Sequence, residues 1–109
     1  MQDIDNRVFN LFIGGEYVPA HKNEYFKTCN PATGSKITEV GRGRKADITD
    51  AVKSASEALD DWRGLNPRKR GAILSDVADA IRTNRERLSV LETKDNGQPI
   101  SEAQSAVES

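Results

Sequence analysis

Apolar residues recur at spacings of three and four through the second half of this 109-residue chain. This periodicity restricts that half to amphipathic helices, because residues spaced in this way share one helical face. The first stripe predicts a helix from Ala46 to Trp62. Asp47 and Asp50 lie near its start, where the helix dipole favours negative charge. The apolar positions of this stripe are Ile48, Ala51, Val52, Ala55, Leu59 and Trp62.

Cap residues divide the rest of the helical region. Gly64 ends the first helix. Asn66 is expected to cap a second one, and Pro67 suits its first position because proline fixes φ near the helical value. Asn84 is expected to cap a third helix, which Gly97 ends in the left-handed conformation. The second and third helices carry apolar stripes made of Ile73, Leu74, Val77, Ala78 and Ile81, and of Leu88 and Leu91.

A fourth helical pattern begins at Pro99 and Ser101, with Ala103 and Val107 on one face. The pattern has neither a cap nor a helix breaker before the last residue, Ser109. We therefore expect the chain to be part of a longer protein.

Strand and turn signals dominate the first 45 residues. Apolar segments at 8–13 and 17–18 flank Gly14-Gly15-Glu16, which predicts a hairpin. Residues 25–29 and 37–40 predict two further strands.

The segment Asn30-Pro31-Ala32-Thr33-Gly34 predicts a turn between these two strands, because Asn30 can bond back onto the chain and Gly34 accepts a positive φ. The expected fold class is therefore α/β. Three regions follow along the chain: an N-terminal extension over 1–10, a strand and turn region over 11–45, and a helical region over 46–109.

Charge and composition exclude several classes of protein. The 17 acidic and 16 basic residues give a net charge of −1, which does not support nucleic-acid binding by phosphate neutralisation. Apolar runs such as Leu11-Phe12-Ile13 are far shorter than the roughly 20 residues of a membrane-spanning helix. The acidic start, Met1-Gln2-Asp3-Ile4-Asp5, differs from a signal peptide. We expect a cytoplasmic protein with no nucleic-acid or membrane partner.

Cys29 and His21 are the residues that a nucleophilic enzyme would use. A cysteine nucleophile requires a base or a site that lowers its pKa. His21, the only histidine, lies in a polar stretch before a predicted strand. We therefore interpret Cys29, the single cysteine, as a small buried apolar side chain at a strand end. The single cysteine excludes an internal disulfide and a cysteine-based zinc cluster, and His21 alone cannot form a zinc site.

Gly41-Arg42-Gly43 follows a predicted strand and precedes a predicted helix, as a dinucleotide-binding loop does. Position 46 is Ala where a third glycine is usual. The region that would supply the partner acid, around Asp60, is helical. We interpret residues 41–45 as a flexible, basic connector.

Two charge clusters are candidates for chemistry. Asp60-Asp61 would suit general acid–base catalysis, and Arg68-Lys69-Arg70 would suit phosphate binding near a helix start. We interpret both as solvated helix surface. Arg70 is the exception, because its position three residues before Ile73 indicates a buried or paired side chain.

Five motifs, in order, resemble the aldehyde dehydrogenase superfamily over roughly Leu11 to Glu108. They comprise an opening strand segment, an Asn-Pro-x-Thr-Gly turn, two helices and a Leu-Glu-Thr-x-Asp-Asn-Gly-Lys-Pro segment. Lys94 and Gln98 depart from the last motif, where an apolar residue and a lysine are usual, and we interpret both as surface changes. The matching segments are 11–18, 30–34, 47–62, 70–81 and 91–99.

The resemblance implies an α/β fold in which N-terminal strands precede three to four amphipathic helices, as part of a Rossmann-like cofactor domain. Such enzymes oxidise aldehydes to carboxylic acids with NAD or NADP. They use a cysteine thiolate, hydride transfer and a glutamate-activated water. The family's motifs for these steps lie downstream, so no catalytic or cofactor-binding residue is assigned here. The implied partner is the remainder of the polypeptide, in an enzyme expected to be a homo-oligomer.

The resemblance also implies a structural Na⁺ or K⁺. Its ligands would be the backbone carbonyl oxygens of Thr28 and Cys29 and the carboxylate of Asp95, since oxygen donors suit hard cations. The alternative is that Asp95 caps or pairs at the end of the third helix. No cofactor is expected for this chain alone.

Three functional hypotheses follow. The first is the N-terminal segment of an NAD(P)-dependent aldehyde dehydrogenase, without catalytic residues and inactive alone. The second is a free-standing interaction module that docks on a full-length relative through an open strand edge. The third is a small independent enzyme that uses His21 or Cys29. We expect the isolated chain to expose an apolar stripe or a strand edge and to be marginally stable or self-associating.

Overall fold

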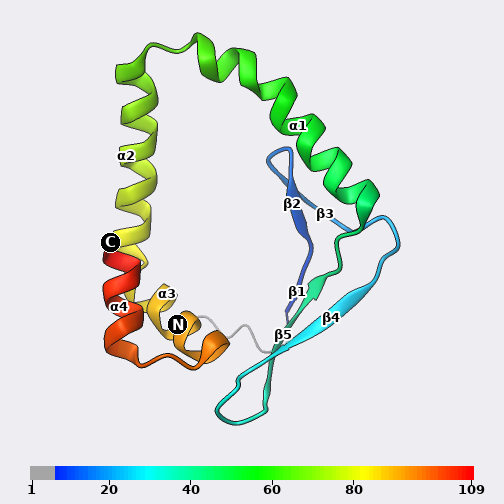
Figure 1. The fold of residues 1–109 in the computed structure, drawn as a ribbon, viewed down its shortest axis with the longest axis vertical. Helices are drawn as coiled ribbons and strands as arrows, with labels where there is room; N and C mark the ends of the chain where they lie inside the picture. Colours follow the sequence, from blue (N-terminus) through cyan, green and yellow to red (C-terminus); the bar gives the residue numbers. More distant parts are fainter. Residues whose placement is uncertain (1–6) are drawn as a thin grey trace. The chain divides into compact units, whose positions relative to one another are not determined.

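The computed structural model describes residues 7–109, in which five strands and four helices follow one another along the chain (Figure 1). The mixed α/β class is therefore confirmed. The first six residues of the expected N-terminal extension lie outside the described residues. Contacts divide the described chain into a strand unit (residues 7–28 and 38–65) and a helical unit (residues 29–37 and 66–109), and each is described by itself.

A three-stranded sheet runs in the order β1 (Val8–Phe9), β5 (Lys36–Gly41), β4 (Tyr25–Cys29). β1 and β5 are parallel, with Val8 opposite Glu39 and Phe9 opposite Val40. β4 has the predicted bounds, and β5 exceeds the predicted strand by one residue at each end.

The single strand predicted over residues 8–13 is wrong. Asn10 separates β1 from β2 (Leu11–Ile13), and these two strands belong to different sheets. The Asn10 side-chain oxygen accepts a hydrogen bond of 2.7 Å from the Tyr25 hydroxyl. Asparagine is depleted in strands, which fits a break at this position.

The predicted hairpin is present. β2 pairs antiparallel with β3 (Glu16–Val18), with Leu11 opposite Val18. Gly14 and Gly15 both have positive φ angles, of 66° and 83°. A two-residue hairpin loop with positive φ at both positions favours glycine. Glu16 therefore lies in the strand and not, as predicted, in the turn.

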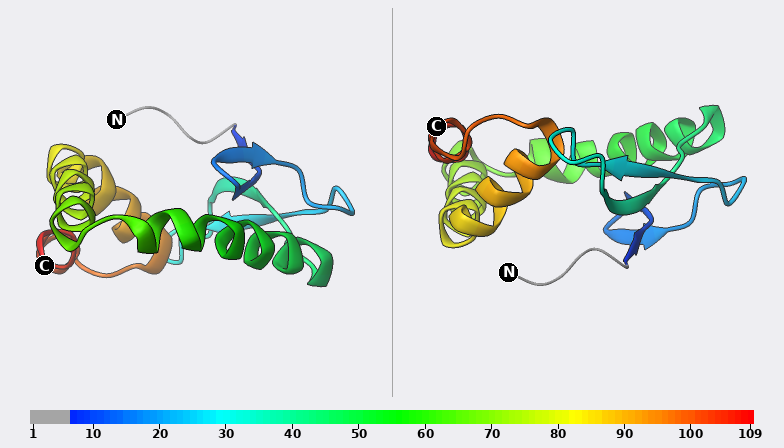
Figure 2. Two further views of the ribbon diagram at one scale, coloured as in Figure 1. Left: turned by 90° about the horizontal axis from the view of Figure 1, so that it is seen from above. Right: turned by 90° about the horizontal axis from the view of Figure 1, so that it is seen from below.

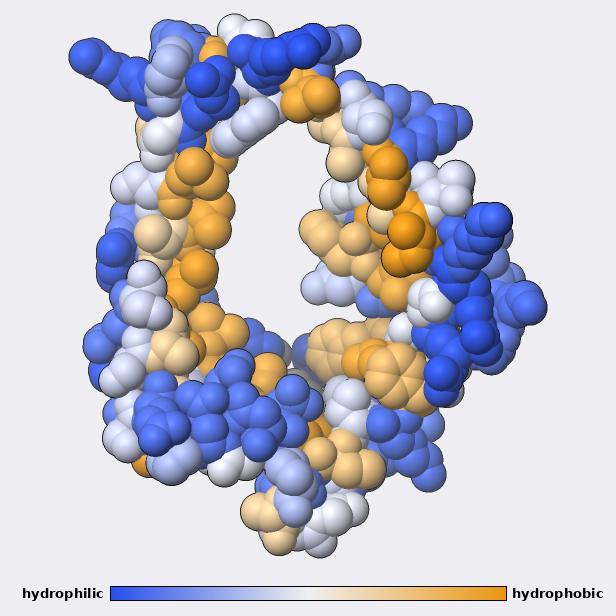
Figure 3. Space-filling model, viewed as in Figure 1, coloured by the Kyte–Doolittle hydropathy of each residue, from blue (hydrophilic) through white to orange (hydrophobic). Residues whose placement is uncertain are grey.

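Helix α1 (Lys45–Gly64) carries small and large residues along its apolar stripe, and they differ in their surroundings. Small residues, Ala51, Ala55 and Ala58, line a groove against the hairpin. A Cβ atom added to Gly14 would lie 3.3 Å from Ser54 Oγ, so the hairpin turn approaches the helix closely. The large apolar residues of the predicted stripe remain exposed along one side of the helix (Figure 3), namely Ile48, Val52, Leu59 and Trp62.

Three helices build the helical unit: α2 (Pro67–Thr83), α3 (Arg85–Asn96) and α4 (Ile100–Glu108). The predicted Asn66 cap is confirmed, because its side-chain oxygen accepts the Lys69 N–H at 2.9 Å. Gly97 also has the predicted left-handed conformation, with φ of 80°. The Asn84 prediction is correct in position only. Its side chain makes no cap bond to α3 and instead donates to the Ala80 carbonyl at 2.8 Å, which completes the end of α2.

Helices α3 and α4 lie side by side (Figures 1 and 2) and have the most extensive contact of any two helices. Ser89 and Ala103 are both 0% exposed. Small side chains allow two helices to approach closely. The Ser89 hydroxyl donates to the Arg85 carbonyl at 2.7 Å, so its burial leaves no unpaired donor.

Few large apolar side chains are buried in the described part of the chain, where the buried apolar residues are Ala20, Ile37 and Ala103. A band of apolar side chains follows one side of α2 (Figure 3). Its residues, Ile73, Leu74, Val77 and Ile81, are 40–60% exposed. The expected exposure of apolar stripes is therefore confirmed. No helix among residues 7–109 is long and apolar enough to cross a membrane.

Candidate functional site

The strand unit brings the only histidine together with two acids of α1. The turn between β3 and β4 places His21 against the first two turns of the helix. His21 Nε2 lies 2.7 Å from Asp50 Oδ2, and the His21 backbone N–H donates to Asp47 Oδ1 at 2.9 Å. We call these three residues the His21 cluster.

Asp47 joins two backbone segments. Its second oxygen, Oδ2, accepts the Arg44 N–H at 2.8 Å, so one carboxylate holds the turn at His21 and closes the start of α1. Its side chain is only 3% exposed. The bond from Arg44, followed by the bond from His21, lowers the pKa of Asp47 below its ordinary value, despite the opposing effect of burial.

A further pair ties the same turn to the start of the helix. Arg44 Nη2 contacts Glu24 Oε2 at 2.8 Å, which lowers the pKa of Glu24, and the Arg42 N–H donates to the Glu24 carbonyl at 2.8 Å. The Arg42 guanidinium lies 5.1 Å from the centre of the Phe26 ring. The prediction that residues 41–45 form a flexible connector is therefore wrong. Gly41 ends β5, Lys45 begins α1, and Arg42 and Arg44 both have defined partners.

The hydrogen bonds of residues 41–47 show whether this segment could act as a dinucleotide-binding loop. A phosphate cradle requires free backbone N–H groups at the start of the helix. Here the Arg42 N–H is bonded to Glu24 and the Arg44 N–H to Asp47. The Asp47 carboxylate would also repel a phosphate. The residues at 41–47 do not fit a nucleotide phosphate, and no step of a reaction is assigned to them.

The candidate cation ligands occupy two places in the chain. Thr28 and Cys29 end β4, and Asp95 lies in the last turn of α3. Within the helical unit, the turn after β4 lies against the end of α3, because a Cβ atom on Gly97 would come within 3.1 Å of Pro31 Cγ. The Asp95 side chain is exposed, and no described residue forms a hydrogen bond or ion pair with its carboxylate.

Cys29 is exposed, so its interpretation as a buried apolar side chain is wrong. The reason is that β4 shows little burial along its length. The His21 imidazole is engaged with Asp50. Among residues 7–109 no group of three acids, histidines or cysteines could hold a metal ion.

The two charge clusters lie on solvated helix surface, as predicted. Asp60 pairs with Arg63 at 2.5 Å, with side chains 83% and 70% exposed. Arg68 and Lys69 are exposed, whereas Arg70 is half-buried, in line with its expected exception.

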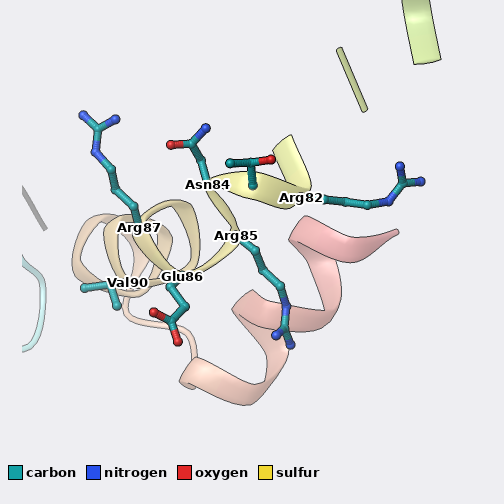
Figure 4. Close-up of a pocket in the computed structure, with 7 residues that line it drawn as sticks. Arg82, Asn84, Arg85, Glu86, Arg87 and Val90 are labelled. Carbon is teal, nitrogen blue, oxygen red and sulfur yellow. The ribbon is translucent and has the colours of Figure 1, made fainter. Parts of the chain in front are cut away.

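A cavity of about 620 Å³ lies at the corner between α2 and α3. Figure 4 shows that its arginines diverge: Arg82 and Arg87 point away from one another, and Arg85 extends toward α4. Arg82 pairs with Asp79 at 2.9 Å, and Arg85 Nε lies 2.7 Å from Glu108 Oε1. The contact between Arg85 and Glu108 is an ion pair, but its geometry does not make a hydrogen bond. Because these cations do not converge, the cavity does not form an anion site.

The model of the aldehyde dehydrogenase family matches residues 17–109. The chain belongs to the aldehyde dehydrogenase family. It is 39% identical over 98 residues to a probable aldehyde dehydrogenase of Streptomyces coelicolor, covering 90% of this chain and 19% of that protein. It is 40% identical over 99 residues to the NADP/NAD-dependent aldehyde dehydrogenase PuuC of Escherichia coli, covering 89% of this chain and 19% of that protein.

Solved structures of the family have the same fold. The crystal structure of HpcC from Thermus thermophilus matches with a TM-score of 0.90 and 30% identity, over 94% of this chain and 20% of that chain. An NAD⁺ complex of an aldehyde dehydrogenase from Bacillus cereus matches with a TM-score of 0.86 and 35% identity, over 91% of this chain and 21% of that chain. The resemblance inferred from the sequence is confirmed. The chain spans about a fifth of the length of the curated relatives it matches.

Sequence reasoning did not find the His21 cluster. The sequence predicts Asp47 and Asp50 at the start of a helix and His21 in a polar stretch before a strand, and nothing in it connects the three residues. The available signal was Asp47 itself, because an acid at the third helical position commonly accepts the N–H of the cap residue. Such a signal identifies the helix start and not the distant turn that shares the same carboxylate.

Proposed function

We propose that this chain serves as the N-terminal segment of an NAD- or NADP-dependent aldehyde dehydrogenase that oxidises an aldehyde to a carboxylic acid, and that it is inactive alone. The observation that carries the proposal is the family match over residues 17–109 in a chain that spans a fifth of its relatives. The dual cofactor in the name of the E. coli relative and the NAD⁺ in the B. cereus structure support the choice of cofactor.

The exposed apolar faces support a scaffolding role. Trp62 and Leu59 on α1 and Leu74 on α2 are 38–60% exposed. Contiguous exposed apolar surface marks sites that bind other protein surface. In the proposed enzyme the remainder of the polypeptide covers these faces, and the enzyme is a cytoplasmic homo-oligomer. The exposed, unpaired Cys29 fits a reducing compartment.

A structural Na⁺ or K⁺ is part of the proposal. The Thr28 and Cys29 carbonyl oxygens and the Asp95 carboxylate would hold it, and these hard oxygen donors match the chemistry of such a cation. Two observations within the helical unit support the part of this set made by Cys29 and Asp95. The turn that follows Cys29 contacts Gly97, two residues after Asp95, and the Asp95 carboxylate has no partner among the described residues.

A chimera tests the proposed function. In it, this chain replaces the matching segment of the E. coli relative. We expect the purified chimera to reduce NAD or NADP in the presence of an aldehyde, and the isolated chain to show no turnover. Turnover by the isolated chain that Cys29→Ala abolishes would contradict the proposal. A folded chimera without activity, beside an active parent enzyme, would also contradict it.

A second candidate function is an interaction module that docks on a full-length relative. It is favoured by β4, which lies at the edge of its sheet and exposes Tyr25 and Phe26. An unpaired strand edge can add a strand from another chain. Size-exclusion chromatography of this chain with the intact E. coli relative distinguishes the two functions. Only the module forms a complex with an enzyme that already contains its own N-terminal segment.

A further inference from the structure

The turn between β3 and β4 is attached to α1 by contacts of two kinds. The first kind does not require a proton on an imidazole: Asp47 accepts the backbone N–H of His21 at 2.9 Å, and Glu24 pairs with Arg44 at 2.8 Å. The second kind is the 2.7 Å contact between His21 Nε2 and Asp50 Oδ2. Only this contact changes its charge when the histidine loses a proton.

The charges around His21 favour the protonated ring. From α1 the acids Asp47 and Asp50 face the turn, and the turn itself contributes Lys22 as the adjacent cation. The neighbouring strands β2 and β3 contribute the apolar residues Ile13 and Val18. The hydrogen bond to Asp50, followed by the charge of Asp50, raises the pKa of His21 above its ordinary value, and the charge of Asp47 adds to this effect against the cost of desolvation.

We propose that His21 and Asp50 form a proton-dependent latch that fastens the turn of residues 19–24 to the first turns of α1. With His21 protonated the latch is an ion pair between two residues that line a cavity of about 410 Å³ formed by the turn, the hairpin and the helix. With His21 neutral the ion pair is lost, while Asp47 still holds the backbone of the turn. The turn then loosens without leaving the helix.

The direction of the pH effect follows from linkage. A histidine whose pKa is higher in the folded chain stabilises the fold below its unfolded pKa, and this contribution is lost as the pH rises through the folded value. Both side chains are about half exposed, at 54% and 55%, so solvent screens the pair and the latch is weak. A weak latch fits local opening of a turn and not global unfolding.

The chain contains one histidine, so an NMR titration reports this imidazole without assignment. We expect the titration midpoint of His21 in the folded chain to lie above the midpoint in urea. The variant Asp50→Asn should lower the midpoint of His21. The control is Asp60→Asn, which removes an exposed acid of the same helix that pairs with Arg63, and it should leave the midpoint unchanged. Equal midpoints in the folded and unfolded wild-type chain would overturn the proposal, and this comparison requires no variant to fold.

Amide hydrogen exchange, expressed as protection relative to the unstructured chain, tests the opening of the turn. The Asn23 N–H donates to the Ala20 carbonyl at 2.8 Å within the turn. Its protection should fall severalfold as His21 deprotonates in the wild type and stay constant with pH in Asp50→Asn. The Gly97 N–H, bonded to the Thr93 carbonyl in the helical unit, is the internal control. Constant protection of Asn23 across the wild-type titration would overturn the latch.

Discussion

Gly97, at the end of α3, lies so close to Pro31 that a Cβ atom added to the glycine would come within 3.1 Å of the proline Cγ. The glycine also has a φ of 80°. Two independent constraints, backbone conformation and space, therefore favour glycine at this position. The contact joins the turn after β4 to the end of α3 within the helical unit.

Gly97→Ala should lower the free energy of unfolding by about 1–2 kcal/mol, the usual penalty for a left-handed non-glycine residue. Gly71→Ala is the matched control, because Gly71 lies inside α2 with no atom within 4 Å of an added Cβ. Alanine there should stabilise the chain by up to about 1 kcal/mol. Urea unfolding followed by circular dichroism measures both, and equal effects of the two changes would contradict the contact.

Asn66→Ala should cost about 1 kcal/mol, because the Lys69 N–H loses its acceptor at the start of α2. Asn66→Asp keeps an acceptor oxygen in the same place and should retain the wild-type stability. Thermal unfolding of the two variants side by side separates loss of the cap from any general effect of substitution. An alanine variant as stable as the aspartate variant would show that the cap contributes nothing.

Ala103→Leu should destabilise the helical unit by about 1–3 kcal/mol, because the site is completely buried against neighbouring helices and has no room for three more carbon atoms. Ala106 lies on the same helix and is exposed, so Ala106→Leu should change stability little. The comparison uses chemical unfolding, and a harmless Ala103→Leu would mean that α4 packs loosely on α3.

Asp47→Asn should destabilise the strand unit at neutral pH. An asparagine has one oxygen, so its NH₂ group would face the N–H of either Arg44 or His21, and one donor would lose its acceptor. The pKa of Asp47 is lowered in the folded chain, so its contribution is present above the unfolded pKa and is lost as the pH falls through the folded value. The gap in unfolding midpoint between wild type and variant should therefore close in acid. The control is Asp61→Asn, which removes an exposed acid of the same helix and should leave the unfolding midpoint equal to that of the wild type.

Asp95→Ala tests the proposed cation. The wild-type chain should melt at a higher temperature in NaCl or KCl than in tetramethylammonium chloride of equal ionic strength, because a ligand that binds only the folded state stabilises it. Asp95→Ala should remove this difference, and Asp76→Ala, which removes an exposed acid of α2, should retain it. A wild-type chain that responds equally to all three salts would contradict the site.

The sequence contains enough local information to place all four helices, because their boundaries depend on adjacent residues. Asn66 and Pro67 begin α2, and the left-handed Gly97 ends α3, through local backbone geometry. The break at Asn10, whose side chain bonds to Tyr25 fifteen positions away, could not be predicted from periodicity.

The same distinction applies to the candidate site. Asp47 was placed correctly at a helix start, but its bond to His21 spans 26 positions and depends on tertiary structure. The exposure of Cys29 depends on what packs beside β4, which no property of the cysteine reveals. Features that depend on neighbouring residues are therefore predictable from the sequence, and contacts between distant residues are not.

The pairing of β1 with β5 has a consequence for the order of folding. Among the described residues, only two pairs join β1 to β5, and the paired segments lie about 30 positions apart. The chain therefore loses the entropy of closing a long loop and gains only a very short ladder in return. The β2–β3 hairpin closes over two residues and forms on a much faster timescale. We therefore expect β1 to be the last strand to join and the first to detach, which would leave one edge of β5 open to pairing with another strand.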